Sequence, residues 1–182
     1  MKLTEKRLKS DYAFKGRILN LRVDTVELPN GRTSTREVVE YAGAVAVVAL
    51  DEQGNVVLVR QYRYPVGREL VEIPAGKIDR NEDPLECARR ELAEETGYRA
   101  REWQSLLRFY STPGFTSEHM HLFLAKGLEA GEQAPDEDEF VEVRKVPLSE
   151  AVAMVERGEI CDAKSIVGLL VASRVYAGST TI

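Results

Sequence analysis

The fold is decided by residues 76–98, which read GKIDRNEDPLECARRELAEETGY. This stretch predicts a helix, because Asp83 is a good N-cap and Pro84 fits the first helical position. The helix should end at Gly97, since a left-handed cap favours a residue without Cβ. Apolar residues recur on one face, namely Leu85, Ala88 and Leu92. We therefore expect that face to pack against a core.

Three glutamates, Glu91, Glu94 and Glu95, lie away from the apolar face of this helix. At 3.6 residues per turn, Glu91 and Glu95 are about 40° apart and Glu94 projects about 60° to the far side of Glu91. Three carboxylates this close repel one another and gain nothing as a solvated surface. Hard oxygen ligands on one helical turn are what Mg²⁺ or Mn²⁺ requires. The alternative is an ordinary Glu-rich surface helix.

The pattern of fixed positions extends over the whole stretch. It runs from Gly76 through five residues to Glu82, then through seven residues to Arg90-Glu91-Leu92-Ala93-Glu94-Glu95-Thr96-Gly97. This pattern resembles the signature of the Nudix hydrolases at every fixed position. Tyr98 departs from it, because the family usually has an aliphatic residue there, although an aromatic side chain still buries apolar surface.

The resemblance implies an α/β fold, a Nudix-type α/β/α sandwich with a mixed sheet, over residues 43–182. It also implies a Mg²⁺ site, with Mn²⁺ as the alternative ion, whose ligands are Glu91, Glu94, Glu95 and the carbonyl of Ala75. Arg90 would fix the rotamers of the carboxylates, and Glu82 would support the preceding loop.

Composition sets the remaining bounds. The chain has 182 residues, 43% of them hydrophobic and 30% charged, which suits one well-buried core. The net charge of −5 without a Lys/Arg block makes nucleic acid an unexpected partner. Cys87 and Cys161 have no metal or redox spacing, so we expect reduced thiols and a cytoplasmic protein; a single disulfide is the alternative, which a chain of this size does not need. Residues 1–12 are polar and residues 42–50 are too short to span a bilayer, so we expect no signal peptide and no membrane partner.

Residues 1–42 are expected to form an appended β element. A strand over residues 17–28, a turn at Pro29-Asn30-Gly31 and a strand over residues 35–41 predict a hairpin or small sheet. Within the Nudix group the chain resembles the ADP-ribose pyrophosphatases, in which such strands help to build a homodimer. Arg36 is then either a substrate contact or a surface arginine.

Residues 43–75 are expected to form a sheet. The apolar run 44–50 predicts a strand buried on both faces, and residues 56–60 predict the next strand. Arg63 matches a family arginine that contacts the phosphates of the substrate, and a planar fork of donors suits a diphosphate. The alternative role for Arg63 is a structural ion pair.

The strands predicted at 103–110 and 119–125 flank a loop over residues 111–118. Pro113 lies sixteen residues beyond Gly97, and a proline near that offset marks the ADP-ribose pyrophosphatases. Gly114 would let a ligand approach the backbone, and Glu118 matches a family substrate contact. His119 and His121 alternate along the second strand and are expected to be ordinary strand side chains.

A second acidic cluster, residues 135–139, follows a polar loop expected over residues 126–136. The family keeps its general base in such a loop, which makes Glu137 the first candidate base and Glu139 the second. The alternative is a solvated loop tip. A strand over residues 140–146 and two helices, capped by Ser149 and Asp162, should complete the chain.

The implied reaction is hydrolysis of a nucleoside diphosphate linked to another moiety, with ADP-ribose giving AMP and ribose 5-phosphate as the first choice. A nucleotide sugar such as GDP-mannose is the alternative substrate. From a different class, the fold could serve as a non-catalytic ligand-sensing module. The intact acidic set argues against that reading.

Overall fold

The computed structural model describes residues 2–135 and 139–179. Contacts within the chain divide it into two compact units. The smaller unit comprises residues 1–43 and 110–119, and the larger unit comprises residues 44–109 and 120–182.

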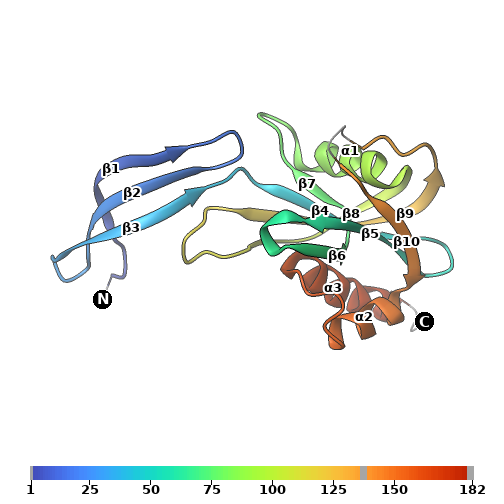
Figure 1. Ribbon diagram of the computed structural model, residues 1–182. Helices are drawn as coiled ribbons and strands as arrows, with labels where there is room; N and C mark the ends of the chain where they lie inside the picture. The colour runs from blue at the N-terminus through green and yellow to red at the C-terminus, as the bar shows by residue number, and fades with distance from the viewer. Residues whose placement is uncertain (1, 136–138, 180–182) are drawn as a thin grey trace. The chain divides into compact units, whose positions relative to one another are not determined.

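The smaller unit is built on a three-stranded antiparallel sheet in the order β1-β2-β3 (Figure 1). Its strands are β1 (Lys6–Lys15), β2 (Asn20–Glu27) and β3 (Thr33–Glu40). The turn expected at 29–31 joins β2 to β3, and Gly31 has a φ of 80° there. Of the hairpin and the small sheet expected from sequence, the small sheet is present, because β1 adds a strand that we did not predict.

The larger unit contains a seven-stranded sheet whose main path is β10-β5-β4-β9-β8, with β6 beside β5 and β7 beside β4. β4 is parallel to β9, whereas its pairings with β5 and β7 are antiparallel, so the sheet is mixed. Its strands are β4 (Ala44–Leu50), β5 (Asn55–Arg63), β6 (Arg68–Glu72), β7 (Ala75–Lys77), β8 (Tyr98–Tyr110), β9 (His119–Ala130) and β10 (Glu142–Pro147).

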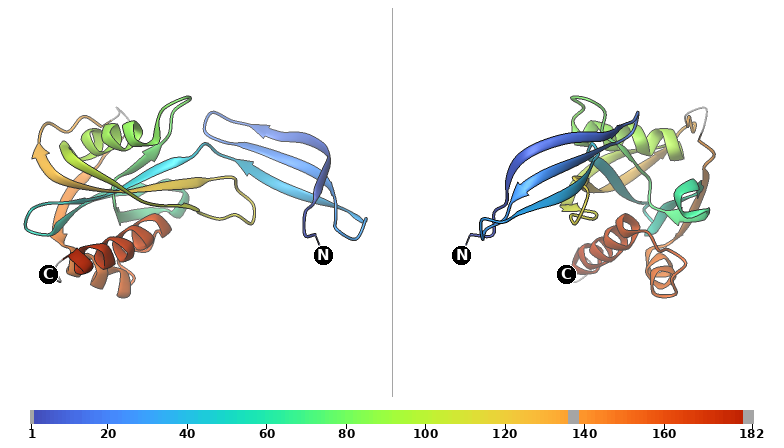
Figure 2. Two further views of the ribbon diagram at one scale, coloured as in Figure 1. Left: turned by 180° about the vertical axis from the view of Figure 1, so that it is seen from behind. Right: turned by 60° about the vertical axis from the view of Figure 1, so that its left-hand side comes forward.

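Helices cover both faces of this sheet. α1 (Pro84–Thr96) lies on one face, and α2 (Leu148–Glu156) and α3 (Ala163–Ser179) lie on the other (Figure 2). Every residue of β4 is buried. Val45 and Val47 belong to the core cluster that includes residues of α1, while Val48, the residue after Val47, approaches Gly168 of α3. An unbroken apolar strand is what two covered faces require, and the predicted α/β/α sandwich is confirmed.

α1 begins and ends at the residues that the sequence indicates. Oδ1 of Asp83 accepts hydrogen bonds from the N–H groups of Leu85 at 2.9 Å and Glu86 at 3.3 Å. Gly97 has a φ of 72°, and a Cβ there would lie 2.8 Å from the carbonyl oxygen of Gly131. Both the backbone conformation and the space therefore favour glycine.

Three details differ from the sequence expectation. β8 begins at Tyr98 rather than at residue 103, and β9 beside it continues to Ala130 where a loop was expected. Strand pairing supports these segments, and Tyr98, Ala100 and Leu128 in them pack against the core cluster. Ser149 does not cap α2, which begins one residue earlier, and the Leu148 N–H donates to the Gly54 carbonyl instead. No helix within residues 2–135 and 139–179 is long and apolar enough to cross a membrane.

Candidate active site

The loop before the motif and the last turn of α1 meet at the acidic cluster. β7 pairs with β4, and the Pro74 carbonyl accepts a hydrogen bond from the Val47 N–H at 2.9 Å. These contacts fix Ala75, whose N–H donates to Oε2 of Glu95 at 2.9 Å. Ala75, whose carbonyl is the metal ligand that the resemblance implies, is therefore hydrogen-bonded to Glu95 of the motif.

Gly76 makes room for the second glutamate of the cluster. A Cβ on Gly76 would lie 1.8 Å from Cδ of Glu91 and 1.9 Å from its Oε1. No side chain can occupy that position while Glu91 keeps its place. The glycine of the motif is thus required by close approach rather than by a positive φ.

Burial sets the electrostatics of the cluster. The side chain of Glu95 is almost fully buried, and burial raises its pKa to about 8. Burial likewise raises the pKa of Glu91 to about 7. Glu94 is more open, with 37% of its side chain exposed. A divalent cation beside the two buried carboxylates would favour their ionised form.

Arg90 joins three carboxylates around this cluster. Its guanidinium donates to Glu82, Glu91 and Glu94, each at 2.9 Å. The Arg90 hydrogen bond holds the pKa of Glu82 down at about 2. Glu82 also accepts a hydrogen bond from the Asp79 N–H at 3.0 Å, so it supports the loop as the resemblance implies.

Glu139 and Arg63 lie within electrostatic reach of the buried carboxylates. After burial itself, the negative charge of Glu139 contributes to the raised pKa of both Glu91 and Glu95. The positive charge of Arg63 acts on the pKa of Glu95 in the opposite direction. Glu137, the first candidate base, lies outside the described residues.

Arg63 forms the ion pair that was its alternative role. Its Nε donates to Oε2 of Glu72 at 2.7 Å, and 36% of its side chain remains exposed. The ion pair does not exclude a substrate contact, because a guanidinium has further N–H donors.

Four predicted substrate contacts lie in the smaller unit, namely Arg36, Pro113, Gly114 and Glu118. Arg36 lies on β3 and forms an ion pair with Glu5. Glu118 accepts a hydrogen bond from the hydroxyl of Ser111. Their part in substrate binding stays a prediction.

The arrangement of the glutamates bears on metal binding. Among residues 2–135 and 139–179, no group of three His, Cys, Asp or Glu side chains is arranged to hold a metal ion. Glu91 and Glu94 accept hydrogen bonds from Arg90, and Glu95 accepts one from the Ala75 N–H. The donor set still suits a hard divalent cation, since it consists of carboxylate oxygens on the buried Glu95 and the partly buried Glu91 and Glu94.

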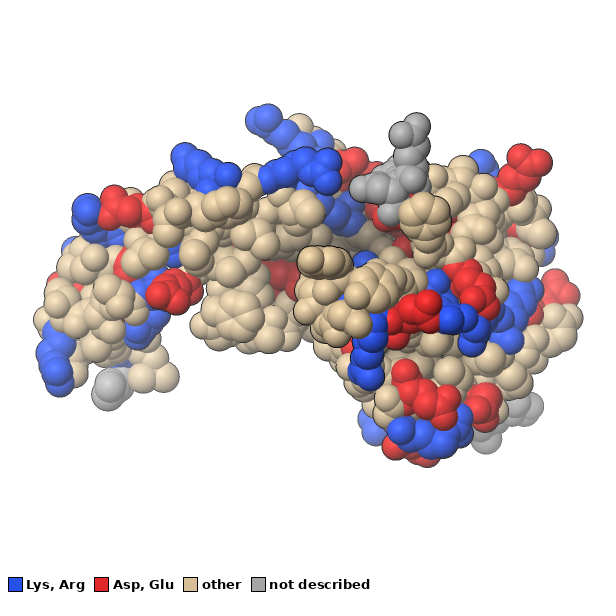
Figure 3. Space-filling view, viewed as in Figure 1, with Lys and Arg blue, Asp and Glu red and all other residues tan. Residues whose placement is uncertain are grey.

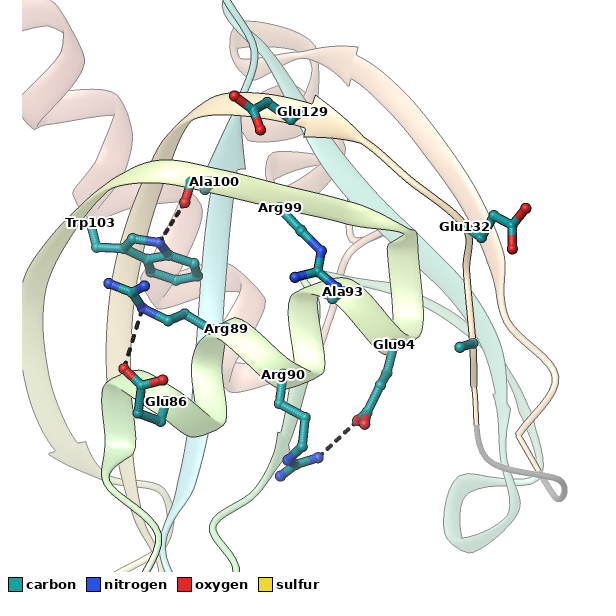
Figure 4. Close-up of a pocket in the computed structure, with 11 residues that line it drawn as sticks. Glu86, Arg89, Arg90, Ala93, Glu94, Arg99, Ala100, Trp103, Glu129 and Glu132 are labelled. Atoms are coloured by element: carbon teal, nitrogen blue, oxygen red, sulfur yellow. Dashed lines mark hydrogen bonds and ion pairs between the residues drawn. The ribbon is translucent and has the colours of Figure 1, made fainter.

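A hollow of about 600 Å³ is lined by α1, the first residues of β8, the end of β9 and the segment after it (Figure 4). It shares Arg90 and Glu94 with the acidic cluster but does not include Glu91 or Glu95. Within this hollow, Cζ of the Arg89 guanidinium lies over the Trp103 ring, 5.8 Å from the ring centroid. The hollow is therefore a neighbour of the acidic cluster and not its centre.

The surface around β5, β6 and β10 is mixed in charge. Figure 3 shows Lys/Arg and Asp/Glu side chains alternating over this part of the larger unit. Arg60 pairs there with both Glu69 and Glu142. Such a face offers no basic stripe to a phosphate backbone.

Comparison with known proteins agrees with the motif. The NUDIX domain model matches residues 40–167, and the nucleoside diphosphate sugar hydrolase N-terminal domain model matches residues 5–39. An ADP-ribose pyrophosphatase of Bacillus subtilis (strain 168) is 47% identical over 165 residues, which cover 90% of this chain and 89% of that protein. A methanol dehydrogenase activator of Bacillus methanolicus is 46% identical over 167 residues, covering 91% of this chain and 90% of that protein.

A solved structure of an ADP compounds hydrolase has the same fold, with a TM-score of 0.89 over 100% of both chains at 22% identity. Hydrolases of the family generally need a divalent metal ion. The motif, the fold and a family model that matches most of the chain all agree. The chain therefore belongs to the Nudix hydrolase family.

Proposed function

We propose that this protein hydrolyses the pyrophosphate bond of ADP-ribose, giving AMP and ribose 5-phosphate, with Mg²⁺ as its metal. The observation that carries the proposal is the set of Glu91, Glu94 and Glu95 on α1, with Glu95 hydrogen-bonded to Ala75 and with the charge of Arg63 lowering its pKa against the larger effect of burial. Carboxylates suit divalent cations, and an arginine beside them suits the diphosphate that those cations neutralise. The identity to ADP-ribose pyrophosphatases supports the choice of substrate.

The metal ligands would be Glu91, Glu94, Glu95 and the Ala75 carbonyl, for Mg²⁺ or alternatively Mn²⁺. When bound, such ions neutralise charge on the diphosphate and lower the pKa of a bound water, in favourable cases from about 15.7 towards about 7. Arg90 now occupies oxygens of Glu91 and Glu94. The same arginine keeps both carboxylates close together before they bind a cation.

The remaining residues bind and orient the reactants. Arg63 would hold the diphosphate through the N–H groups that Glu72 leaves free. A carboxylate of the acidic loop would take a proton from the attacking water, with Glu137 as the first candidate and Glu139 as the second. In the smaller unit, Arg36, Pro113, Gly114 and Glu118 would contribute contacts to the rest of the substrate.

A product assay tests this function. Wild-type protein is incubated with ADP-ribose, GDP-mannose and other nucleoside diphosphate derivatives in Mg²⁺, Mn²⁺ or EDTA, and products are separated by ion-exchange chromatography. The expected result is AMP and ribose 5-phosphate from ADP-ribose as the best substrate, lost in EDTA. Failure to cleave any member of the panel would overturn the proposal.

A nucleotide sugar such as GDP-mannose is the second candidate substrate. The observation in its favour is the match of residues 5–39 to the N-terminal domain of nucleoside diphosphate sugar hydrolases. A higher kcat/KM for GDP-mannose than for ADP-ribose in the same panel would identify the nucleotide sugar as the preferred substrate.

We also propose that residues 1–42 form a homodimerisation element and that residues 43–182 carry the chemistry. All ten residues of β1 are exposed, including Leu8, Tyr12 and Phe14. A thin sheet whose exposed strand carries large apolar side chains gains stability from a second copy. Sedimentation at micromolar concentration should give the dimer mass, and a monomer would contradict the proposal.

The two free cysteines, Cys87 and Cys161, suit a cytoplasmic location.

A further inference from the structure

Glu72, the last residue of β6, is a carboxylate with two cationic partners. The residue is only 2% exposed. Its Oε2 accepts the hydrogen bond from Nε of Arg63, and its Oε1 accepts one from Nζ of Lys164. A buried charge is costly unless it is paired and hydrogen-bonded. Removal of either cation would therefore leave an oxygen of Glu72 without its partner.

Arg63 uses one side of its guanidinium for this contact. Within the part of the chain that the structure describes, no hydrogen bond or ion pair involves Nη1 or Nη2 of Arg63. A guanidinium has five N–H donors in a fixed plane, so the contact at Nε orients the others. The plane is thus set before any ligand arrives.

Lys164 is itself held in place at the start of α3. Oδ1 of Asp162 accepts hydrogen bonds from Nζ of Lys164 at 2.7 Å and from the N–H of Ser165 at 3.1 Å. The hydroxyl of Ser165 accepts one from the N–H of Ile73 at 2.9 Å. Two adjacent residues of α3 thus contact two adjacent residues at the end of β6. The Lys164 side chain is only 15% exposed, so its ammonium group has little freedom to leave Glu72.

We propose that Lys164 and Glu72 are positioning residues for Arg63, acting in series. Lys164 fixes the Glu72 carboxylate, and Glu72 holds Nε of Arg63 so that its free N–H groups are ready for a diphosphate. The benefit is preorganisation, because a flexible arginine would lose side-chain entropy on binding. The inference rests on the proposed function in one respect, that Arg63 binds the diphosphate.

A double-mutant cycle tests the series. Steady-state kinetics are measured for wild type, Arg63→Ala, Lys164→Met and the double variant. Lys164→Met should raise KM by about 10-fold while kcat changes little. In the Arg63→Ala background the same change should raise KM no further, because the lysine acts through that arginine. KM factors that multiply in the double variant would overturn the proposal.

Further variants separate positioning from stability. Glu72→Gln should reproduce the rise in KM, and Lys164→Arg should restore most of the wild-type KM. Lys145→Met is the matched control, because Lys145 also pairs with a carboxylate, Asp51, at 3.4 Å but is not part of this network. Its KM should equal that of wild type. If Lys164→Met does not fold, the Glu72→Gln/Lys164→Met variant takes its place in the cycle.

Binding without turnover distinguishes this proposal from the proposed function. The Kd of α,β-methylene-ADP, which is not hydrolysed, is measured by calorimetry across the same cycle. Non-additive Kd changes support positioning even if the substrate panel shows no cleavage, which would overturn only the proposed function. Additive Kd changes in an active enzyme would overturn only the positioning role.

Discussion

The backbone N–H of Ala75 donates to Oε2 of Glu95 across 2.9 Å. This bond ties the residue that enters the motif to the most buried carboxylate of the motif helix. It also means that a substitution at Glu95 acts on two proposed metal ligands at once.

Loss of one motif carboxylate should remove activity and spare the fold. Glu94→Gln and Glu95→Gln should each lower kcat by roughly 10²-fold or more, because each removes a charge from the proposed metal site. Thermal melting should stay close to wild type, since repulsion between the carboxylates decreases. The control is Glu86→Gln, which changes an exposed residue of the same helix that faces Arg89. Near-wild-type turnover in both motif variants would refute the metal site.

The two loop glutamates should differ in their kinetic effect. Glu137→Gln should lower kcat by about 10²- to 10⁴-fold with KM close to its original value, because a general base acts on water rather than on substrate. Glu139→Gln, beside Glu91 and Glu95, should instead raise the Mg²⁺ concentration needed for half-maximal rate. If the large loss of kcat appeared in Glu139→Gln alone, the base would be Glu139.

Gly76 should tolerate no side chain while Glu91 is present. Gly76→Ala should lower the free energy of unfolding by about 1–3 kcal/mol, because its Cβ would overlap the Glu91 carboxylate. In the Glu91→Ala background the same change should cost clearly less. Urea unfolding of the four proteins measures this, and an equal cost in both backgrounds would contradict the close approach.

Two serines of α3 offer a matched comparison of stability. Ser165→Ala should cost about 1–3 kcal/mol, because it leaves the buried Ile73 N–H without an acceptor. Ser173→Ala should cost far less, since its hydroxyl bonds the Leu170 carbonyl at an exposed position. Equal losses of unfolding free energy in urea would contradict a stabilising role for the hydrogen bond between Ser165 and Ile73.

The two thiols should react at very different rates. Cys161 is exposed, whereas Cys87 lies on the buried face of α1, in the core cluster. Burial raises the pKa of Cys87 to about 12, so at pH 8 its thiol is almost wholly protonated and unreactive. A colorimetric thiol reagent should titrate one thiol promptly and the second only in denaturant. Cys161→Ser should remove the prompt phase, and its persistence would contradict the assignment.

The sequence predicts α1 and β4 well because their signals are local. Asp83 and Gly97 mark the ends of the helix by backbone chemistry, and a strand buried on both faces shows as a continuous apolar run. β1 escaped prediction because its ten exposed residues follow no pattern of burial and pair only with β2. The Ser149 cap was wrong because the partner of the Leu148 N–H is a carbonyl from a distant turn.

The same distinction holds for the site. The motif places Glu91, Glu94 and Glu95 on one helical turn, and periodicity alone predicts that. The contact between Glu72 and Lys164 joins residues 92 positions apart, and only tertiary structure brings them together. One signal could have indicated it, a glutamate inside the apolar run Leu70-Val71-Glu72-Ile73. A charge in such a strand requires a partner, but sequence alone does not name it.

The parallel pairing of β4 with β9 has a consequence for the order of folding. Ala44 lies beside Met120, so the central strand pair closes only after the intervening segment has been synthesised. Contacts between such distant residues form slowly, because the entropy of loop closure precedes any gain from pairing. The strands of the small sheet are neighbours in sequence and can pair early on the ribosome. Until β9 arrives, β4 exposes an apolar strand with an open edge, which makes this interval the one in which the nascent chain is most prone to aggregate.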